Sequence, residues 1–511
     1  MTDELPFSRY FSRPVAISNG KAARVTDKLV GYCTVLCDRG LSTMEAVEQL
    51  TYLLMLKLED ERLSLYPAVP GDSWPASADP YRWDSLTQRQ GEELVAHFSE
   101  ILSHRSHHGT GTMLDSVFAG AQNHIHDGGL LRRLVYDFFD VATWSELGTD
   151  VLGEAYEALL ERAMNDVKGG AGQYFTPRPL IDAMVEVIQP ELTDTVTDPA
   201  CGTGGFLTGV HDYLAHHSLV HATHDDWVRY HTQFWGQELV PRAAQLATAN
   251  LILQGVASAD QPALIAVGDA LAQPPGRHAS LVLAHPPFGR HAVIPGESSG
   301  IARNDALSRT DFVTGSIDKQ VNFLQHVMSL TAKPGRAAVV VPDNILFATG
   351  AAETVRRHLL REFDVHTVLR LPAGIFASHG IRASVIFFER PASNTYDRPR
   401  TTKVWVYDMR SELQFASSHD PDLRHDLDDF VSVYLPGRPR TERVETERFR
   451  CFDSQEVLDQ SQARLDLTWP PESSHIGYPP PEEIAQDIAH DLHLALKKFE
   501  DLAADLRGEA D

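Results

Sequence analysis

The sequence predicts an α/β fold: a mostly parallel β-sheet that follows an α-helical N-terminal domain and precedes a C-terminal segment with a helical tail. Apolar residues recur at helical spacing through residues 1–165. Short apolar runs then alternate with amphipathic stretches through residues 166–400. Such alternation is typical of a parallel sheet with helices on both faces. Residues 401–511 have a mixed pattern and form the third segment.

Helices are expected throughout the first segment. The apolar pattern predicts them within VTDKLVGYCTVLCDRG, LSTMEAVEQLTYLLMLKLEDERL, TQRQGEELVAHFSEILSH, GLLRRLVYDFFDVATW and DVLGEAYEALLERAMND. In the second of these, Glu45 follows Ser42 at the spacing of a capping box. We therefore expect that helix to begin just after Ser42.

Strands and helices alternate in the second segment. Strands are expected within TVTDPA, QFWGQEL, ALIAVGDAL, SLVLAHPPF, RAAVVVPDN, DVHTVLRLP and SVIFFER. Helices are expected within PRAAQLATANLILQGV, VNFLQHVMSLTAK and ETVRRHLLREF. Ligands of such sheets bind at the carboxyl ends of the strands, so the residues that follow each strand are the first to inspect for chemistry.

The third segment contains one predicted strand and one long predicted helix. TTKVWVYDM has the pattern of a strand, whereas SSHDPDLRHDLDDF, residues 417–430, is interpreted as polar surface. Residues 484–507 are predicted to be helical, and their apolar residues follow a heptad spacing. This stripe packs either on the protein's own body or on a partner.

The bulk properties bound the function. The 511-residue chain is 43% hydrophobic and 23% charged, and it has no apolar run long enough to span a membrane. The N-terminus lacks the apolar core of a signal peptide, and four cysteines in so long a chain indicate a reducing compartment, so a cytoplasmic location is expected. The net charge of −25 is unusual for a protein that binds DNA alone, and a DNA-binding function would require a basic partner.

Three successive predicted strands end in features that suit a ligand. Gly202, Gly204 and Gly205 follow the first strand within DPACGTGGF, and they allow a tight turn and a close backbone approach. The pattern is neither GxGxxG nor a P-loop. The second strand ends in Glu238, where an acidic residue typically accepts from ribose hydroxyls, and the third ends in Asp269, which can accept from an adenine amine. Together they predict a binding site at this edge of the sheet.

Upstream, GGAGQYFTPRPLIDAM leads into a predicted helix. Thr176 is a natural N-cap and Pro177 a natural first helical residue. The free N–H groups of that helix start would suit a carboxylate. The glycines also fit a hinge that joins two domains, and the two interpretations are compatible.

The fourth strand runs directly into His285, Pro286, Pro287 and Phe288. Neither proline can donate to a sheet ladder, and both restrict the backbone, so the chain is fixed where the strand ends. The prolines present carbonyl acceptors at fixed positions, and the phenylalanine offers a flat aromatic face.

In this order, GQYFTPRPL, DPACGTGGF, GQE and PPF resemble the modification (methyltransferase) subunits of type I restriction systems. VEQLTYLLMLKLEDER, LPAGIFASHGIRASVIFF and KVWVYDMR extend the resemblance over nearly the whole chain. It implies a Rossmann-like methyltransferase domain that makes N6-methyladenine in DNA from S-adenosyl-L-methionine. It also implies the cofactor-binding residues Gln173, Tyr174, Phe175, Thr176, Pro177, Arg178, Asp198, Gly202, Thr203, Gly204, Gly205, Glu238 and Asp269.

Within this implied set, residues 173–178 would line the methionine end of the cofactor, and Asp198 with residues 202–205 would pass beneath its centre. Glu238 would hold the ribose and Asp269 the adenine amine. The resemblance further implies DNA as the substrate, a separate specificity subunit that reads its sequence, and a second copy of this chain in the complex. A restriction subunit is a further partner that the resemblance allows. The acidic charge fits this dependence on a partner, and it favours a partner role for residues 484–507.

The implied chemistry assigns a catalytic role to residues 285–288. An enzyme can activate an adenine amine by placing acceptors on its N–H groups and by fixing the line of attack. The base must leave the duplex, and Phe288 would stack on it. The family usually has Asn, sometimes Asp, where this chain has His285. Neutral histidine offers one acceptor nitrogen, and imidazolium offers none.

Three interpretations of His285 remain open. It acts as the acceptor, it shifts the target or the conditions of activity, or the chain binds cofactor and DNA in a defence complex with weak or no methylation. In the first case, methylation should fall as the pH drops through the ordinary histidine pKa of ~6.5. Methylation of protein glutamine, which a related motif also serves, is a further alternative.

Other residues carry weaker expectations. Residues 289–320 are long and polar, which fits a loop beside the site. The arginines considered as phosphate contacts or ordinary solvated side chains are Arg356, Arg357, Arg361 and Arg382. Neither the histidines near 104–108 and 124–126 nor the cysteine pair at 33 and 37 has convincing metal-site spacing, so no metal is expected.

Overall fold

The computed structural model describes residues 19–65, 80–107, 111–165, 176–219, 223, 226, 230, 232–289, 309–372, 374–376, 382–392, 398–410, 421–459 and 462–469. The chain separates into two compact units, Met1–Asp466 and Leu467–Asp511. Every element named below lies in the first unit. The predicted helix at 484–507 lies outside the described residues. The divisions expected near residues 165 and 400 stay a prediction.

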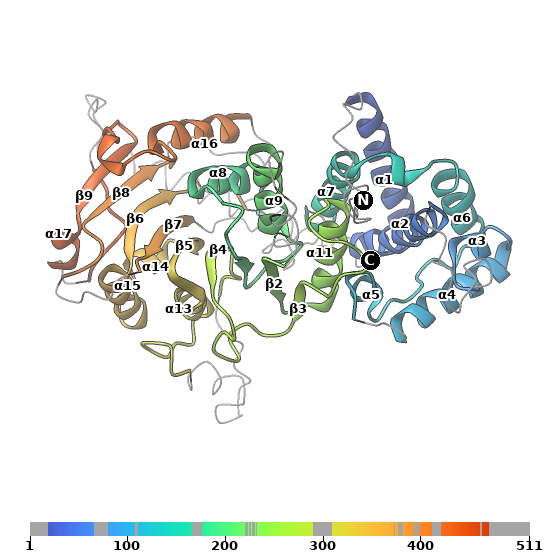
Figure 1. The fold of residues 1–511 in the computed structure, drawn as a ribbon, viewed down its shortest axis with the longest axis horizontal. Helices are drawn as coiled ribbons and strands as arrows, with labels where there is room; N and C mark the ends of the chain where they lie inside the picture. Colours follow the sequence, from blue (N-terminus) through green and yellow to red (C-terminus); the bar gives the residue numbers. More distant parts are fainter. Residues whose placement is uncertain are drawn as a thin grey trace, which may run out of the picture. The chain divides into compact units, whose positions relative to one another are not determined.

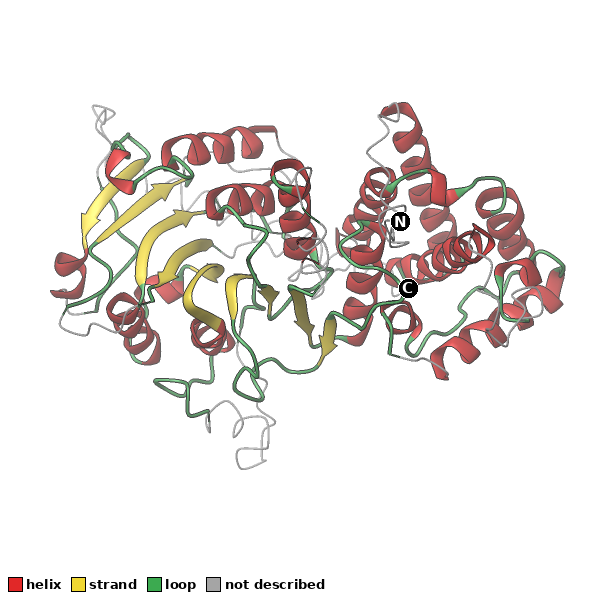
Figure 2. Ribbon diagram, viewed as in Figure 1, coloured by secondary structure: helices red, strands yellow, loops and turns green. Residues whose placement is uncertain are grey.

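The predicted N-terminal helices are confirmed (Figure 2). They are α1 (Asn19–Asp38), α2 (Thr43–Leu65), α3 (Trp83–Leu86), α4 (Gly91–His107), α5 (Met113–Phe118), α6 (Gly128–Arg132), the π-helical η3 (Arg133–Phe139), the 3₁₀ turn η4 (Trp144–Glu146) and α7 (Thr149–Asn165). At the start of α2, the Ser42 amide donates to Glu45 Oε2 at 2.9 Å, and the Glu45 amide donates to Ser42 Oγ at 3.3 Å. The predicted capping box is therefore present. No helix in the described part is both long and apolar enough to cross a membrane.

The described strands form one sheet in the order β3-β2-β1-β4-β5-β7-β6-β8-β9. Their bounds are β1 (Val196–Asp198), β2 (Phe234–Glu238), β3 (Ile265–Val267), β4 (Ala279–Ala284), β5 (Thr331–Pro342), β6 (Asp364–Arg370), β7 (Ala383–Arg390), β8 (Lys403–Asp408) and β9 (Phe449–Asp453). The neighbours from β3 to β5 are parallel, as are β6 and β8, whereas β7 and β9 run antiparallel to their neighbours. The sheet is mostly parallel, as predicted.

The strand order places a topological switch between β1 and β4, because the chain moves from β1 to β2 and β3 on one side and then returns to β4 on the other. The carboxyl ends of these four parallel strands lie at one edge of the sheet. Open α/β sheets bind ligands at such a switch. DPACGTGGF follows β1 and HPPF follows β4, so the fold brings the two motifs to neighbouring strand ends.

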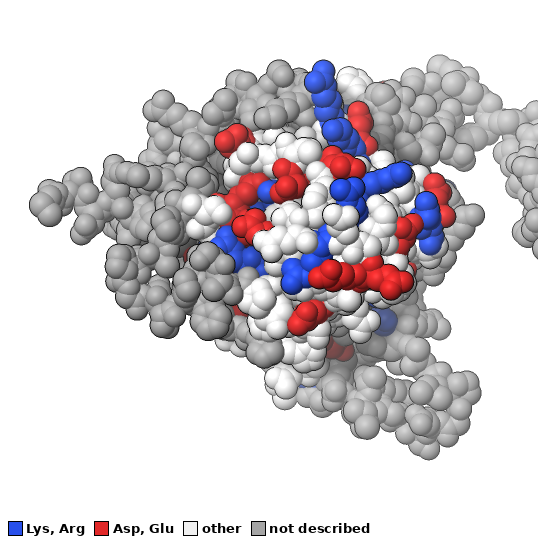
Figure 3. All heavy atoms as spheres, turned by 90° about the vertical axis from the view of Figure 1, so that its right-hand side faces the viewer, with Lys and Arg blue, Asp and Glu red and all other residues white. Residues whose placement is uncertain are grey.

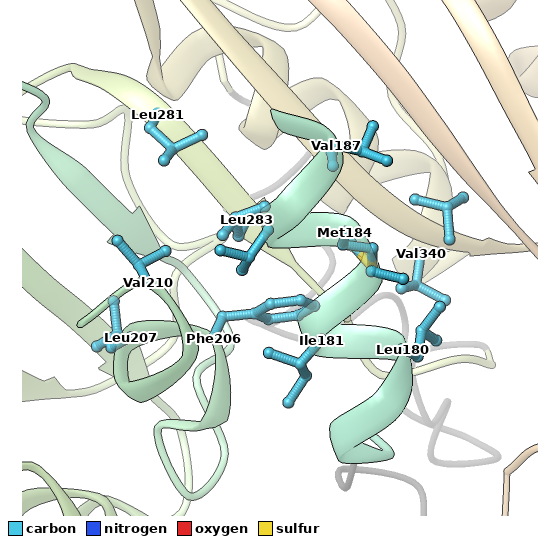
Figure 4. Close-up of a cluster of buried hydrophobic side chains, with 14 of the residues drawn as sticks. Leu180, Ile181, Met184, Val187, Phe206, Leu207, Val210, Leu281, Leu283 and Val340 are labelled. Atoms are coloured by element: carbon cyan, nitrogen blue, oxygen red, sulfur yellow. The ribbon is translucent and has the colours of Figure 1, made fainter. Parts of the chain in front are cut away.

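Helices cover both faces of the sheet (Figure 1). α8 (Arg178–Ile188), α9 (Gly205–His217) and α16 (Pro421–Tyr434) lie on one face, and α13 (Lys319–Leu330) and α15 (Ala351–Glu362) lie on the other. In Figure 4, Phe206 of α9 packs among α8 side chains and Leu283 of β4. A Cβ on Gly209 of α9 would lie 2.5 Å from Ile181 Cγ2, so the close approach of α8 and α9 requires glycine there.

Helix α11 (Pro241–Leu253) connects the helical part to the sheet. Leu246, Ala249 and Leu253 join the buried cluster of the N-terminal helices. Ala247 and Leu251 join the buried cluster of the sheet. Two apolar faces on one helix are expected when that helix lies between two cores.

One prediction for the C-terminal segment is wrong. Residues 421–430, interpreted as polar surface, belong to α16, whose Leu423, Leu427 and Phe430 are fully buried. Their spacing of four and three residues places them on one face of the helix. The remaining short elements are α14 (Asn344–Phe347), η7 (Arg440–Glu442) and α17 (Ser454–Asp459).

Candidate active site

The turn between β1 and α9 depends on its glycines. Gly202 and Gly204 have φ values of 53° and 85°, a backbone region that other residues rarely adopt. The Gly204 amide donates to the carbonyl of Cys201 at 2.7 Å, and Asn250 of α11 donates through Nδ2 to the carbonyl of Thr203 at 3.0 Å. The turn is therefore held in a fixed shape by a bond within it and by a bond from α11.

Glu238 holds this turn from the neighbouring strand. Its Oε2 accepts from the Gly202 amide at 2.9 Å, and its Oε1 accepts from the Val240 amide at 2.9 Å. The side chain is buried, and burial raises its pKa. Each carboxylate oxygen has further acceptor capacity beyond these bonds. Asp269 is exposed one strand further on, where its Oδ1 accepts from the Leu271 amide at 2.9 Å.

Asp198 ends β1 beneath the turn. Its side chain is buried, and its Oδ1 accepts from the Ala200 amide at 2.9 Å. Burial raises the pKa of Asp198 to about 8, and the charge of Glu238 adds to the rise. The carboxyl group is therefore mainly protonated at neutral pH. A cation bound beside it would favour the ionised form.

Two exposed apolar side chains lie beside the buried Glu238, a feature the motif-based prediction missed. Leu239 and Val267 are 60% and 57% exposed. They lie close together because Val267 pairs with Glu238 across β2 and β3. Large exposed apolar side chains beside polar acceptors are typical of a site for a flat, partly apolar ligand. The signal in the sequence was the pair Leu239-Val240 after the acidic end of the strand.

His285 begins the second half of the site, directly after β4. It is 5% exposed, and its Nδ1 lies 2.8 Å from Thr176 Oγ1. Its Nε2 is also buried and has no hydrogen-bond partner among the described residues. The ring packs against Phe376, with centroids 4.6 Å apart, and against Phe288, with centroids 5.3 Å apart.

Burial lowers the pKa of His285 to about 4. The imidazole is therefore neutral at physiological pH and keeps one acceptor nitrogen. The expectation that His285 would become protonated near pH 6.5 is wrong, because the apolar surroundings disfavour the cation. Phe376 is a contact that sequence reasoning missed, since it lies far along the chain in a segment without a recognisable strand or helix pattern.

The position of Thr176 also corrects a prediction. α8 begins at Arg178 after an N-cap at Pro177 that makes no side-chain capping bond. Thr176 lies one residue earlier and is buried, and its hydroxyl bonds to His285 instead of capping the helix. Gln173, Tyr174 and Phe175 lie outside the described residues.

Arg178 is bound by three carboxylates. Its guanidinium contacts Asp182 at 2.6 Å, Glu157 of α7 at 2.8 Å and Asp212 of α9 at 2.5 Å. Burial opposes its charge, but these carboxylates raise the pKa of Arg178. The residue joins the N-terminal helices to the helices of the sheet, and all three contacts point its side chain at protein groups.

Two of the arginines considered as phosphate contacts are held internally. Arg356 is fully buried and donates to the carbonyls of Ala463, Ile345 and Gln462. Arg357 pairs with Glu353 at 2.9 Å and donates to the carbonyl of Leu458. Arg356 cannot reach a phosphate in this conformation. Within the described residues, no group of three or more His, Cys, Asp or Glu is arranged to hold a metal ion.

The surface of the N-terminal helices has mixed charge. Figure 3 views the side on which α3, α4 and α6 lie in Figure 1, and acidic and basic side chains alternate over its described residues. Among the described residues, the half-buried Arg89 and the exposed Glu93 form a pair of opposite sign at 3.6 Å. The described part of this face therefore has no broad basic patch of the kind that duplex DNA attracts.

Comparison with known proteins establishes the family. Residues 147–441 match the family described as N-6 DNA Methylase. The type I restriction enzyme EcoKI methylase subunit of Escherichia coli (strain K12) is 31% identical over an alignment that covers 94% of each chain. The StySJI methylase subunit of Salmonella typhimurium is 30% identical with the same coverage. The chain belongs to the N-6 DNA methylase family.

Solved structures agree with this assignment. A modification subunit of a putative type I restriction enzyme from Vibrio vulnificus YJ016 is 25% identical, with a TM-score of 0.66 over 87% of this chain and 94% of that chain. A chain from a structure of a type I R-M system has a TM-score of 0.69 over 95% and 99% of the two chains, and at 24% identity it supports the fold alone. The predicted methyltransferase fold, family and activity class, N6-adenine methylation of DNA by a type I methylase subunit, are confirmed.

Proposed function

We propose that this chain is the modification subunit of a type I restriction-modification-like defence system, and that it transfers a methyl group from S-adenosyl-L-methionine to N6 of an adenine turned out of the DNA duplex. The observation that carries the proposal is the juxtaposition at the β1–β4 switch. A glycine turn held by Glu238 follows β1, and β4 is followed by a buried imidazole whose Nε2 has no partner among the described residues.

The residues at the β1–β3 edge fit this cofactor. Glu238 has remaining acceptor capacity for ribose hydroxyls, and Asp269 is exposed for an adenine amine. Leu239 and Val267 offer apolar cover for the adenine ring. Asp198 would ionise beside a cationic group, and residues 173–178 with 202–205 would complete the methionine end. When bound, the cofactor supplies an electrophilic methyl carbon.

The residues after β4 would hold the base. Phe288 is half-buried against the core and would offer its aromatic face for stacking. Pro286 and Pro287 fix the backbone, so their carbonyls do not have to reorganise when the base arrives. His285 Nε2 would accept an N–H of the target amine. Holding that amine in one direction is a large part of the rate enhancement available to the enzyme.

The charge of the chain supports a partner-dependent grip on DNA. A chain of net charge −25 gains little DNA affinity from contacts between basic side chains and phosphates. A basic specificity subunit would supply those contacts. We propose a specificity subunit and a second copy of this chain as partners, with residues 484–507 as a partner-binding helix. A restriction subunit would complete the system.

The test is transfer of a tritiated methyl group to DNA by the full chain, with and without a specificity subunit. We expect transfer that depends on the specificity subunit and that mass spectrometry assigns to N6-methyladenine. Absence of transfer in both cases, with cofactor binding intact, would overturn the enzymatic proposal. That outcome would favour the alternative function, a cofactor- and DNA-binding subunit of a defence complex with weak or no methylation. The observation that favours this alternative is His285, at a position where the family usually has Asn.

A further inference from the structure

Thr176 and His285 are joined by a hydrogen bond across 109 residues of sequence. Thr176 lies just before α8, and His285 lies just after β4. Both side chains are buried, at 8% and 5% exposure, and the imidazole makes no other hydrogen bond among the described residues. Because this buried hydrogen bond joins two motifs from different parts of the proposed site, the question is what the Thr176 hydroxyl does for His285.

The aromatic neighbours of His285 fix the plane of its ring but not which edge faces the site. Phe376 and Phe288 contact the imidazole through apolar ring atoms, and such contacts are nearly equal for the two orientations related by a half-turn of the ring. A hydrogen bond to Nδ1 separates the two orientations. The bond to the Thr176 hydroxyl therefore favours the orientation in which Nε2, and not Cε1, lies on the side of the ring away from Thr176.

The same bond can also decide the tautomer. Either Thr176 donates to Nδ1 and Nε2 carries the hydrogen, or Nδ1 carries the hydrogen and donates to Thr176 Oγ1. Each arrangement leaves one buried hydrogen without an acceptor among the described residues, on Nε2 in the first and on the Thr176 hydroxyl in the second. The first arrangement, however, would point a donor at the N–H groups of a target amine. The second arrangement leaves a lone pair on Nε2.

We propose that Thr176 is a positioning residue: its Oγ1 accepts the Nδ1–H of His285, which holds the imidazole in the tautomer and orientation that direct the Nε2 lone pair at the amine of the target base. This inference rests on the proposed function and deepens it. In addition to the place of Thr176 among residues 173–178, it gives this residue a role in the base-binding half of the site. It also explains how histidine replaces an amide: the hydroxyl gives the ring one defined acceptor.

A double-mutant cycle separates positioning from packing. The variants are Thr176→Val, Thr176→Ser, His285→Ala and the Thr176→Val/His285→Ala double variant, each assayed for methyl transfer as the full chain with its specificity subunit. Thr176→Val should lower the rate by about 10–100-fold in the wild-type background and by less than about threefold in the His285→Ala background. Thr176→Ser, which keeps the hydroxyl, should remain within about threefold of wild type. Equal losses in both backgrounds would overturn the proposal.

Thr331→Val is the matched control. Thr331 is also buried, and its Oγ1 donates to the carbonyl of Val327 at 2.8 Å at the start of β5, away from the site. The substitution removes an equivalent buried hydroxyl, so the methyl-transfer rate should be unchanged. A loss equal to that of Thr176→Val would show that a buried hydroxyl acts only through stability, against the proposal.

A spectroscopic measurement tests the inference without any activity. In protein labelled with ¹⁵N-histidine, the His285 signals are assigned by their absence in His285→Ala. The wild-type spectrum should show Nδ1 protonated and Nε2 unprotonated, and Thr176→Val should shift the ring toward the other tautomer. A wild-type ring protonated on Nε2 would overturn the inference even if methylation is observed. A chain that shows the expected tautomer but transfers no methyl group would contradict the proposed function and leave the Thr176 assignment standing.

Discussion

Replacing Asp198 with asparagine should remove a loss of stability that the wild type shows as the pH rises. We expect this although the residue lies at the centre of the proposed cofactor site. Burial raises the pKa of Asp198 from 3.8 to about 8. Between those values the folded protein keeps a proton that the unfolded chain releases. Wild-type stability therefore falls as the pH rises through this window, whereas asparagine has no proton to lose. Asparagine also retains the carbonyl that accepts from the Ala200 amide.

The size of the effect follows from the shift. When a group holds one more proton in the folded state than in the unfolded chain, the free energy of unfolding falls by up to about 1.4 kcal/mol for each unit that the pH rises. Between about pH 6 and pH 7.5, the free energy of unfolding of the wild type should therefore fall by at most about 2 kcal/mol relative to Asp198→Asn. The same variant should bind S-adenosyl-L-methionine more weakly, because it cannot ionise beside a cation.

Urea unfolding followed by circular dichroism, at several pH values in this range, measures the difference between the two proteins. Asp137→Asn is the control, since Asp137 is an exposed aspartate on the N-terminal helices. A constant difference between Asp198→Asn and wild type from about pH 6 to pH 7.5 would refute the reasoning, because it would mean that Asp198 is already ionised.

Three further predictions concern other parts of the site. Because burial lowers the pKa of His285 to about 4, initial rates of methylation should stay flat from about pH 5.5 to 8 with respect to this group; a loss centred near ~6.5 would contradict a buried neutral ring. Arg178→Met should lower the free energy of unfolding by about 2–3 kcal/mol in urea titrations, since it strands three carboxylates around a side chain that is one-third exposed; a change below about 0.5 kcal/mol would argue against that cluster. Phe288→Ala should reduce methylation about 10–100-fold while the cofactor Kd changes less than about twofold; an equal loss of cofactor affinity would argue against a role in base stacking.

Local patterns predicted the alternating elements and the positions of the strand ends, because period and turn chemistry are properties of neighbouring residues. The strand that leads into HPPF and the glycine turn after β1 were found where the patterns placed them. α16 was missed because charged residues surround its apolar stripe, and their number hid the spacing of Leu423, Leu427 and Phe430. The signal was present but weak.

Long-range partners could not be predicted in the same way. Thr176 has the local chemistry of an N-cap, and only the fold shows that His285, 109 residues away, takes its hydroxyl instead. Arg356 resembles a surface arginine in sequence, yet its guanidinium meets the carbonyls of Gln462 and Ala463. Neither contact leaves a periodic trace in the sequence, because the partners come from separate elements.

The most direct test of the account is the yield of N6-methyladenine from the wild-type chain and from His285→Ala, each combined with a specificity subunit and quantified by mass spectrometry of DNA nucleosides. If His285 Nε2 holds the target amine, the wild type should produce N6-methyladenine, and the variant should be slower by about 10²–10³-fold while still binding the cofactor. Equal yields from the two proteins would contradict the role of His285. Methylation of a base other than adenine would contradict the proposed reaction.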